Sequence, residues 1–289
     1  MKKIVATLLS LTIILMFSGC SSEKNTSSEN SGNMNSEYTY AESNGDFNLE
    51  KELEKFLLEQ NNCKRIKISD KIFNNIVSVD IMNKFYVVTT EEGIIYCLSL
   101  DLPFSDGKNY RKIEPEMPLT YLFNSNGRPH FINDNLEVYR LSMSNWDFSF
   151  EYVKTIDNLE TIENIKATRK FCPDSKRIVD ILNCEYFENN KIYSGINQAI
   201  KYSFNDDEII EYYIGNTIKT NKGVYYAHVS YEKKFVDSEP TEEFIVEKEE
   251  LLKNVDFAWW GNCGWSFVIN KDTLYYVSLN SDFDFPFGE

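Results

Sequence analysis

Two histidines and one glycine-flanked cysteine are the most obvious candidates for chemistry in this sequence. His130 lies in Arg-Pro-His-Phe and His228 in Ala-His-Val-Ser, and neither the H-E-x-x-H zinc pattern nor the G-x-S-x-G nucleophile turn occurs. Cys263 lies between Gly261 and Gly264, but no histidine follows it to serve as a base in the papain-like order. We therefore expect packed or surface histidines and a tight turn at Cys263.

Carboxylates are abundant, with 45 Asp and Glu residues in the chain. Glycoside hydrolysis needs two carboxyl groups about 5 Å or about 6.5 to 9.5 Å apart, one of them with a raised pKa. Among so many acids, chance candidates are expected, and no run matches the D-x-[DN]-x-[DN]-G calcium loop. We predict solvated turn residues and no catalytic, metal or cofactor site; the acids considered are Asp80, Asp206, Asp207, Glu208, Asp282 and Asp284.

The tryptophan cluster near the end of the chain is the most distinctive local feature. Trp259 and Trp260 close the run Phe-Ala-Trp-Trp, and Trp265 follows the glycine-flanked turn. Exposed indole rings stack on sugar rings or hold a cation on their π face, whereas packed rings fill a core. Trp259, Trp260 and Trp265 are the candidate ligand-binding residues, with core packing as the alternative.

The N-terminal residues decide the expected compartment. Lys2 and Lys3 precede the apolar run Ile4–Phe17, which leads into Ser-Gly-Cys20. Fourteen residues span about 21 Å as a helix, short of the ~30 Å hydrocarbon core of a bilayer, so a signal peptide is favoured over a permanent membrane helix.

This stretch resembles the lipobox signal peptide of bacterial lipoproteins. The resemblance implies cleavage after residue 19, a diacylglycerol thioether on Cys20, and fatty-acid (palmitate-type) anchoring on the extracytoplasmic face of the cell membrane. The departure from the family pattern is Phe17, where the family most often has Leu.

The charge balance excludes some partners. Cleavage removes two lysines and no acid, which takes the formal charge from −15 to −17. Nucleic acid and anionic lipid headgroups would repel such a surface. We expect a monomer with a protein or carbohydrate ligand, and the field would draw in a basic protein partner.

The cysteine count argues against a disulfide framework. With Cys20 lipidated, five cysteines remain, which is an odd number, and no C-x-x-C pair is among them. We predict buried free thiols, with one bridge between Cys172 and Cys184 as the alternative. The five are Cys63, Cys97, Cys172, Cys184 and Cys263.

Composition divides the chain into a signal peptide (1–19), a lipidated tether (20–47), a helix (48–63) and a β domain (64–289). The tether has almost no aliphatic side chains to bury. The helix is predicted over Leu49–Gln60 with Asn48 as N-cap. Its apolar stripe is expected to pack on the chain's own domain; it consists of Leu49, Leu53, Phe56 and Leu57.

From Ile66 onward, the pattern changes to short strands separated by polar turns, which predicts five hairpins. Their strand pairs are Lys84–Thr90 with Ile94–Leu100, Pro129–Ile132 with Leu136–Met143, Lys191–Ser194 with Ala199–Phe204, Thr217–Thr220 with Val224–Tyr231, and Trp265–Ile269 with Thr273–Leu279.

The second strands of these hairpins align on a serine followed by a bulky residue. Their mean spacing of about 45 residues fits the 40 to 50 of four-stranded propeller blades, although the individual spacings of 43, 61, 27 and 48 are uneven. The aligned serines are Ser99, Ser142, Ser203, Ser230 and Ser278.

The pattern I-Y-x-L-x-x-D at Ile95–Asp101, relaxed at Leu274–Asn280, resembles the degenerate β-propeller repeats of extracytoplasmic bacterial proteins. The resemblance implies an all-β, propeller-like single domain of about five irregular blades; an irregular β-sandwich is the alternative. Thr155–Lys170 and Glu247–Asn254 are helix-like and are interpreted as insertions between blades.

These observations favour a membrane-anchored, extracytoplasmic lipoprotein that acts as a non-catalytic binding module. The alternatives are an enzyme acting on envelope glycans and a tethered immunity or inhibitor protein for a basic partner.

Overall fold

The computed structural model describes residues 45–60, 63–68, 75–82, 84–91, 93–99, 104, 107–125, 128–144, 147–232, 241–261 and 264–277. Contacts divide the chain into Met1–Phe47 and Asn48–Glu289, and of the first unit only Gly45–Phe47 are described, as the start of helix α2 (Gly45–Gln60). Within these ranges no helix has the length and apolarity of a membrane span. Among the candidate site residues and aligned serines considered above, Cys20, Cys263, Ser278, Asp282 and Asp284 lie outside the described residues.

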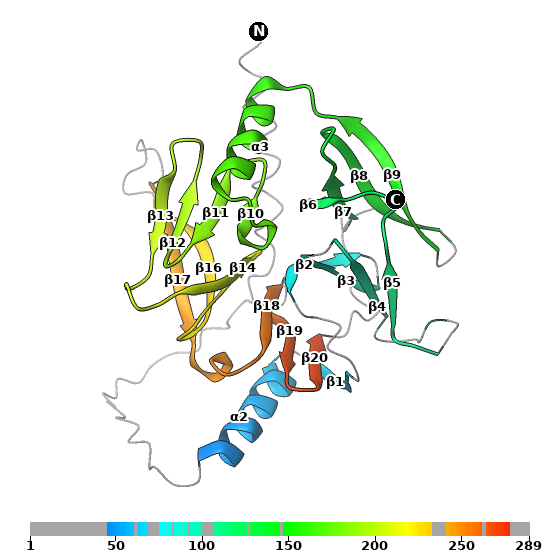
Figure 1. Ribbon diagram of the computed structural model, residues 1–289. Helices are drawn as coiled ribbons and strands as arrows, with labels where there is room; N and C mark the ends of the chain where they lie inside the picture. Colours follow the sequence, from blue (N-terminus) through cyan, green and yellow to red (C-terminus); the bar gives the residue numbers. More distant parts are fainter. Residues whose placement is uncertain are drawn as a thin grey trace. The chain divides into compact units, whose positions relative to one another are not determined.

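The second unit is a five-blade β-propeller in which each blade is a four-stranded antiparallel sheet (Figure 1). The all-β, five-blade prediction is confirmed. Blade 1 consists of β2 (Ile76–Met82), β3 (Phe85–Thr90), β4 (Ile95–Ser99) and β5 (Tyr110–Ile113), and blade 2 of β6 (Thr120–Ser125), β7 (Arg128–Ile132), β8 (Glu137–Ser144) and β9 (Asp147–Thr155). Blade 3 consists of β10 (Ile178–Asp180), β11 (Glu185–Glu188), β12 (Lys191–Ser194) and β13 (Ala199–Ser203), and blade 4 of β14 (Ile210–Ile214), β15 (Thr217–Thr220), β16 (Gly223–Glu232) and β17 (Thr241–Glu249).

Blade 5 closes the ring by combining the two ends of the domain. Its strands in spatial order are β18 (Phe257–Gly261), β19 (Gly264–Asn270), β20 (Thr273–Val277) and β1 (Cys63–Lys67). The N-terminal strand β1 therefore pairs with β20, from Cys63 opposite Val277 to Lys67 opposite Thr273. Nothing in the local sequence pattern indicated this pairing, because its partners lie about two hundred residues apart.

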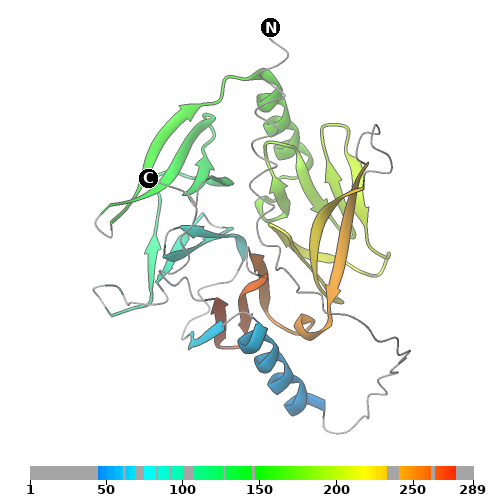
Figure 2. The ribbon, with the colours of Figure 1, turned by 180° about the vertical axis from the view of Figure 1, so that it is seen from behind.

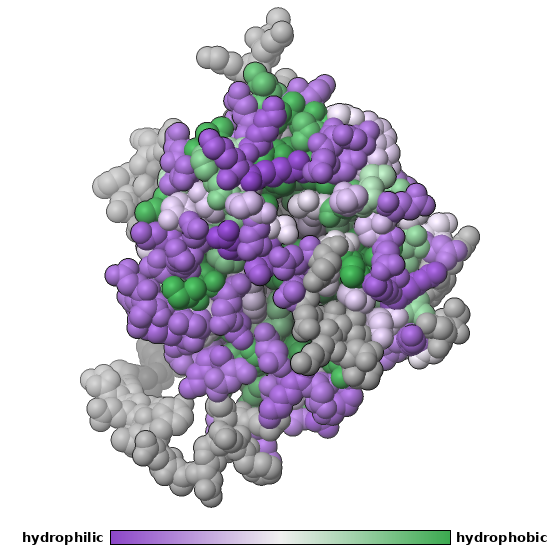
Figure 3. All heavy atoms as spheres, in the orientation of Figure 1, coloured by the Kyte–Doolittle hydropathy of each residue, from purple (hydrophilic) through white to green (hydrophobic). Residues whose placement is uncertain are grey.

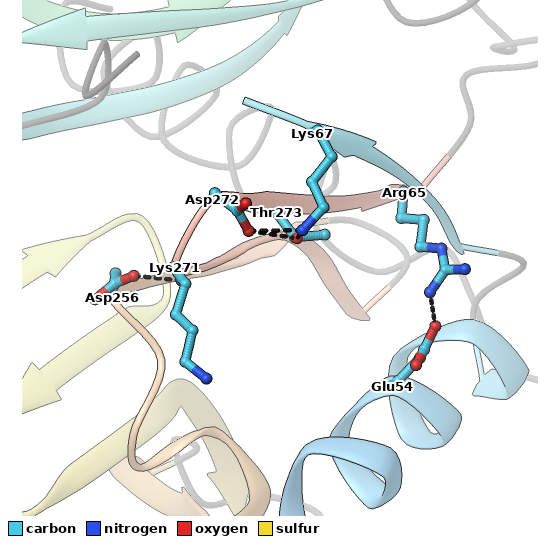
Figure 4. A network of polar contacts seen from close by, with 7 residues as sticks. All are labelled: Glu54, Arg65, Lys67, Asp256, Lys271, Asp272 and Thr273. Atoms are coloured by element: carbon cyan, nitrogen blue, oxygen red, sulfur yellow. Dashed lines mark hydrogen bonds and ion pairs between the residues drawn. The ribbon is translucent and has the colours of Figure 1, made fainter. Parts of the chain in front are cut away.

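Polar contacts connect β1 to helix α2 and to the β19–β20 turn (Figure 4). The Lys67 ammonium lies 2.7 Å from Oδ1 of Asp272 and 3.0 Å from Oγ1 of Thr273, both in or beside the β19–β20 turn. Arg65 donates to Glu54 of α2. The helix and the turn thus hold the closing strand in register, although exposed ion pairs of this kind contribute little free energy individually.

All five predicted hairpins are present, but one of them was assigned to the wrong place in its blade. The pair β12–β13 forms the third and fourth strands of blade 3, whereas the other four hairpins form the second and third strands of their blades. In blade 3, the residue equivalent to the aligned serines of the other blades is therefore Ser194, at the end of the third strand β12, and not Ser203. With Ser194, the uneven spacings of 61 and 27 residues become 52 and 36, much closer to a regular blade.

Each blade is buried on two faces because it packs between its neighbours. Alternate residues of blade 1 illustrate this: Val79 and Tyr86 join the core shared with blade 5, whereas Met82 and Val87 join the core shared with blade 2. Strand alternation places successive side chains on opposite faces. The run Phe-Tyr-Val-Val-Thr-Thr of β3 is accordingly buried at every position.

Helix α2 packs on the propeller through the predicted stripe. Leu53 and Leu57 are buried against Val224, Leu252 and Trp265, and Phe56 lies partly buried beside them. The helix begins at Gly45, so Asn48 lies within it, and the prediction of Asn48 as N-cap was wrong.

The two helix-like stretches have different outcomes. Helix α3 (Leu159–Phe171), capped by the Asn158 side chain, lies between blades 2 and 3 (Figures 1 and 2). Its Ile165 and Ile162 fill the space between Ile132 of blade 2 and Ile181 beside blade 3. The second stretch is strand β17 as far as Glu249, followed by the 3₁₀ turn η2 (Glu250–Leu252), because pairing with the long β16 overrides its helical composition.

Tyrosine hydroxyls cross the interfaces between blades. Tyr86 of blade 1 donates to the carbonyl oxygens of Ser266 (3.2 Å) and Val277 (2.9 Å) in blade 5. Tyr212 of blade 4 donates to the Ala258 carbonyl of blade 5 at 2.9 Å and accepts from the Ala258 amide at 2.8 Å. These bonds satisfy buried backbone groups that the sheets leave free.

Replacing Tyr86 by Phe should destabilise the fold measurably. The change keeps the ring but leaves the buried Ser266 carbonyl and the partly buried Val277 carbonyl without this donor, at a cost of about 1 to 2 kcal/mol in the free energy of unfolding. The matched control is Tyr152→Phe, which removes an exposed hydroxyl that bonds Thr155 within its own strand and should cost less than about 0.5 kcal/mol. Equal losses for the two variants in urea titrations would contradict the cross-blade role.

Candidate ligand-binding site

The three candidate tryptophans differ in burial. Trp265 is 2 % exposed and Trp259 is 9 % exposed, and both belong to the core, whereas Trp260 is half-buried. The Trp259 ring lies over Gly261, where an added Cβ would come within 2.6 Å of its Cζ3. The glycine beside the turn therefore makes room for a packed ring.

Trp260 is the first ring of an aromatic stack that runs from blade 5 to blade 4. Its indole is parallel to the Tyr226 ring at 4.5 Å, and Tyr226 in turn stacks on His228 at 5.6 Å. Trp265 meets Trp260 edge-on at 5.0 Å. The hydrogen bond from Tyr226 to Glu247 and burial raise the pKa of Tyr226 to about 12. Because Trp259 and Trp265 are buried and Trp260 is half-buried, Trp260 is the one of the three tryptophans with exposed surface for a ligand.

Each histidine stacks on an aromatic ring of its own blade. His130 stacks on Phe123 at 4.7 Å and its Nδ1 lies 2.8 Å from the Arg128 carbonyl oxygen. Burial lowers the pKa of His130. His228 lies in strand β16 as its alternation indicated, and its Nδ1 is buried without a hydrogen-bond partner among the described residues.

The described cysteines are buried free thiols, as predicted for them, and Cys172 and Cys184 form no bridge. Burial raises the pKa of Cys63 and of Cys172 to about 11. Thiols with raised pKa values are poor nucleophiles. Cys97 is buried in the same way, in the core between blades 1 and 2.

Two of the acids considered above, Asp207 and Glu208, have ordinary structural roles. Asp207 pairs with Lys222 at the surface, and buried Glu208 accepts from Thr220 at 2.8 Å and from Tyr225. In the part of the chain that the structure describes, no three His, Cys, Asp or Glu side chains lie together as a metal site would require.

Asp80 is a second buried acid and lies in the middle of strand β2. It is 7 % exposed and accepts a hydrogen bond from Tyr121 at 3.0 Å. Burial raises the pKa of Asp80 to about 6, although hydrogen bonds from Tyr121, Asn124 and Ser78 oppose the shift. A glycosidase acid has a raised pKa too, but it must touch the substrate, and Asp80 is shielded from solvent.

A pocket lies where α3 joins blades 2 and 3. Its volume is about 290 Å³, close to the lower limit of small-molecule sites. One guanidinium and two hydroxyls provide polar groups, and the other residues form a mainly apolar wall. The lining residues are Thr120, Arg169, Cys172, Pro173, Ser175, Ile178 and Ile181.

The pocket was not predicted from the sequence. Its residues come from strand β6, the end of α3, the 3₁₀ turn η1 (Ser175–Arg177) and strand β10, and no motif links them. The sequence feature that came nearest to indicating the pocket was Arg169, near the end of the predicted insertion Thr155–Lys170.

Comparisons with known proteins identify no family for this chain and give a distant structural similarity. Neither models of protein families nor curated protein sequences match this chain. Among solved structures, the chain is similar to the crystal structure of the Myceliophteria_thermophila Cps50 (Swd1) β-propeller domain, with 11 % identity and a TM-score of 0.21. The similarity covers 58 % of this chain and 57 % of that one.

Alanine substitutions should separate the tryptophans by their contribution to stability. Trp265→Ala empties a core position and should cost about 3 to 5 kcal/mol of unfolding free energy. Trp260→Ala loses less buried area and should cost roughly 1 to 2 kcal/mol. Denaturant titrations of both variants check this order. The reverse order would contradict the core position of Trp265, and the folded Trp260→Ala protein is the variant to use in ligand assays.

Proposed function

We propose that this protein is a lipid-anchored, extracytoplasmic binding module that holds an oxygen-rich ligand, such as a carbohydrate, between blades 2 and 3. The observation that carries the proposal is the pocket of about 290 Å³ at this interface. Binding sites commonly combine apolar walls with a few convergent polar groups, and rigid β scaffolds commonly present function at such irregular segments.

The chemistry of Arg169 supports an oxygen-rich ligand. Its two described contacts are long, 3.4 Å from Nη1 to Oδ1 of Asp134 and 3.4 Å from Nη2 to the Asn133 carbonyl oxygen. A guanidinium carries five N–H donors, so most of its hydrogen-bonding capacity remains available. Thr120 and Ser175 add hydroxyls that both donate and accept.

Anchoring rests on the lipobox resemblance at Cys20. A diacylglycerol on this residue, with a further acyl chain, would bind the protein stably to a bilayer, since two chains hold a protein where one is marginal. The residues from Ser21 to Gly45, expected to be a tether, would place the propeller on the order of 25 to 30 Å from the membrane.

A protein partner is the second candidate. Strand β9 is the last strand of blade 2, and its Tyr152 and Val153 are 57 % and 41 % exposed. Edge strands of this kind pair with strands of other proteins. The face seen in Figure 3 is mostly hydrophilic with separate hydrophobic areas, and the strong negative charge would favour a basic partner.

Replacing Cys20 by Ser should abolish lipid attachment. The thioether requires the Cys20 sulfur, so incorporation of a labelled fatty acid during growth should be lost completely. Cys263→Ser is the matched control and should keep full labelling. Labelled Cys20→Ser protein would refute the lipoprotein assignment.

Replacing Arg169 by Ala should weaken ligand binding without unfolding the protein. Loss of a charged hydrogen-bond donor costs about 1.5 to 3 kcal/mol, or roughly tenfold or more in Kd. Lys170→Ala is the control, because it removes the same charge from the next residue, which lies outside the pocket lining.

Calorimetric titration with soluble cell-wall and host glycans measures both variants. Binding that falls in Arg169→Ala and stays in Lys170→Ala supports the pocket. Glycan binding that is unchanged in Arg169→Ala would move the site elsewhere, and a loss confined to Trp260→Ala would assign it to the aromatic stack.

A further inference from the structure

One row of side chains crosses all four strands of blade 2. Phe123 of β6 lies opposite His130 of β7, and His130 lies opposite Arg140 of β8. Arg140 in turn lies opposite Glu151 of β9. Because His130 is two residues from Ile132, which packs in the core between blades 2 and 3, the row is on the face of blade 2 toward blade 3.

This row and its flanks have a local excess of positive charge. Arg128 is two residues before His130 on β7 and therefore points to the same face. Lys154 lies opposite Val138, which is two residues before Arg140, and so points there too. Burial lowers the pKa of His130, and the charges of the two arginines and the lysine lower it further. Three cations and the one carboxylate of the row give 3 − 1 = +2, in a chain of formal charge −15.

Two of the three cations have no counter-charge. Arg140 donates to Oε2 of Glu151 from Nε at 2.9 Å and from Nη2 at 2.8 Å. Within the described part of the chain, the side chains of Arg128 and Lys154 form no hydrogen bond or ion pair, and both residues are exposed. They flank the row on opposite sides with strand β8 between them, which places their Cα atoms on the order of 15 Å apart. One small anion cannot contact both, whereas a chain with repeated anionic groups can.

The row continues the wall of the pocket between blades 2 and 3. Thr120, which lines the pocket, lies opposite Ile132. His130 follows on the same face about 7 Å along the strand. The ring of Phe123 stacks on His130 at 4.7 Å and is 36 % exposed, so it offers apolar surface at one end of the row. A ligand chain with one unit in the pocket therefore lies next to the unpaired cations.

We propose that the ligand is an anionic polysaccharide, with one sugar unit in the pocket and its carboxylate or phosphate groups on Arg128 and Lys154. The inference rests on the proposed carbohydrate function and adds the charge of the ligand. Arginine and lysine bind carboxylates and phosphates through charge-assisted hydrogen bonds. The rest of the surface is acidic overall and repels an anionic chain, which restricts the chain to this face. An acidic protein segment offers the same charges but has no sugar unit for the pocket.

The test is calorimetric titration of the full-length protein with polygalacturonate, with its methyl-esterified form and with poly-L-glutamate. Esterification keeps the sugar chain and removes its charge, whereas poly-L-glutamate keeps the charge and removes the sugar. In about 0.05 M salt, polygalacturonate should bind at least about tenfold more tightly than its ester, since charge-assisted hydrogen bonds are roughly twice as strong as neutral ones. In about 0.5 M salt the preference should shrink, because ions screen exposed charges.

A pair of double variants assigns the preference to this face. Arg128→Ala/Lys154→Ala should weaken polygalacturonate binding at least about tenfold in low salt and leave binding of the ester unchanged. Lys55→Ala/Lys253→Ala is the matched control, because it also removes two exposed cations, one from helix α2 and one directly after η2. It should keep the full preference. All four residues are exposed, so both double variants should remain folded.

The outcomes separate this inference from the proposed function. Equal affinity for polygalacturonate and its ester, with both lost in Arg169→Ala, would overturn the inference and leave the proposed function in place. Polygalacturonate binding that is lost in Arg128→Ala/Lys154→Ala but kept in Arg169→Ala would support the anionic ligand and refute the pocket. Equal losses in the two double variants would overturn the inference as a general charge effect. Tighter binding of poly-L-glutamate than of polygalacturonate would overturn it in favour of an acidic protein partner.

Discussion

The pairing of β1 with β20 is the constraint on which the rest of the propeller depends. A ring of sheets buries both faces of every blade only if the first and last blades are joined, and here one strand of five residues joins them. The cores on both sides of blade 1 are then complete. Hydrophobic burial dominates the free energy of folding. The pairing of one short strand therefore determines whether a large apolar area stays buried. Helix α2 reinforces it by packing Leu53 and Leu57 on blade 5 and contacting Arg65 of β1.

Within the ring, the interfaces between blades are held by different means. Tyr86 links blades 1 and 5, Tyr121 links blades 2 and 1, and Tyr212 links blades 4 and 5. Burial and the neighbouring Glu185 of blade 3 raise the pKa of Tyr213 in blade 4. Tyrosine suits these positions because its ring adds apolar area while its hydroxyl reaches a buried acceptor. Between blades 2 and 3, helix α3 takes this place, and its Thr168 hydroxyl lies 3.2 Å from the Ile181 carbonyl oxygen. The pocket occurs where the helix replaces direct sheet packing.

The sequence carried the local information and lacked the nonlocal information. Alternating Tyr, Val and Ile with polar turns predicted one hairpin in each of the five blades, because strand period and turn chemistry are encoded within a few residues. Ring closure was not predictable, since Cys63 and Val277 carry no mark of their pairing. The serine alignment chose Ser203 over Ser194 because blade 3 has very short strands. The sequence could not show that Gly261 accommodates the Trp259 ring, nor that Asp80 and Glu208 are the buried ones among the acids considered.

Strand β6 contributes to the pocket on one face and contacts the buried Asp80 on the other. Thr120 lines the pocket between blades 2 and 3, whereas the next residue, Tyr121, turns to the opposite face and bonds Asp80 between blades 1 and 2. Consecutive residues of a strand point to opposite faces, so a single strand both lines the pocket and bonds Asp80. A displacement of β6 that opened the pocket would also draw the Tyr121 hydroxyl away from a buried carboxylate, and the loss of that charge-assisted bond opposes the movement. The hydrogen bond from Tyr121 to Asp80 thereby adds to the rigidity of one wall of the pocket, and a rigid wall lowers the entropic cost of holding a ligand.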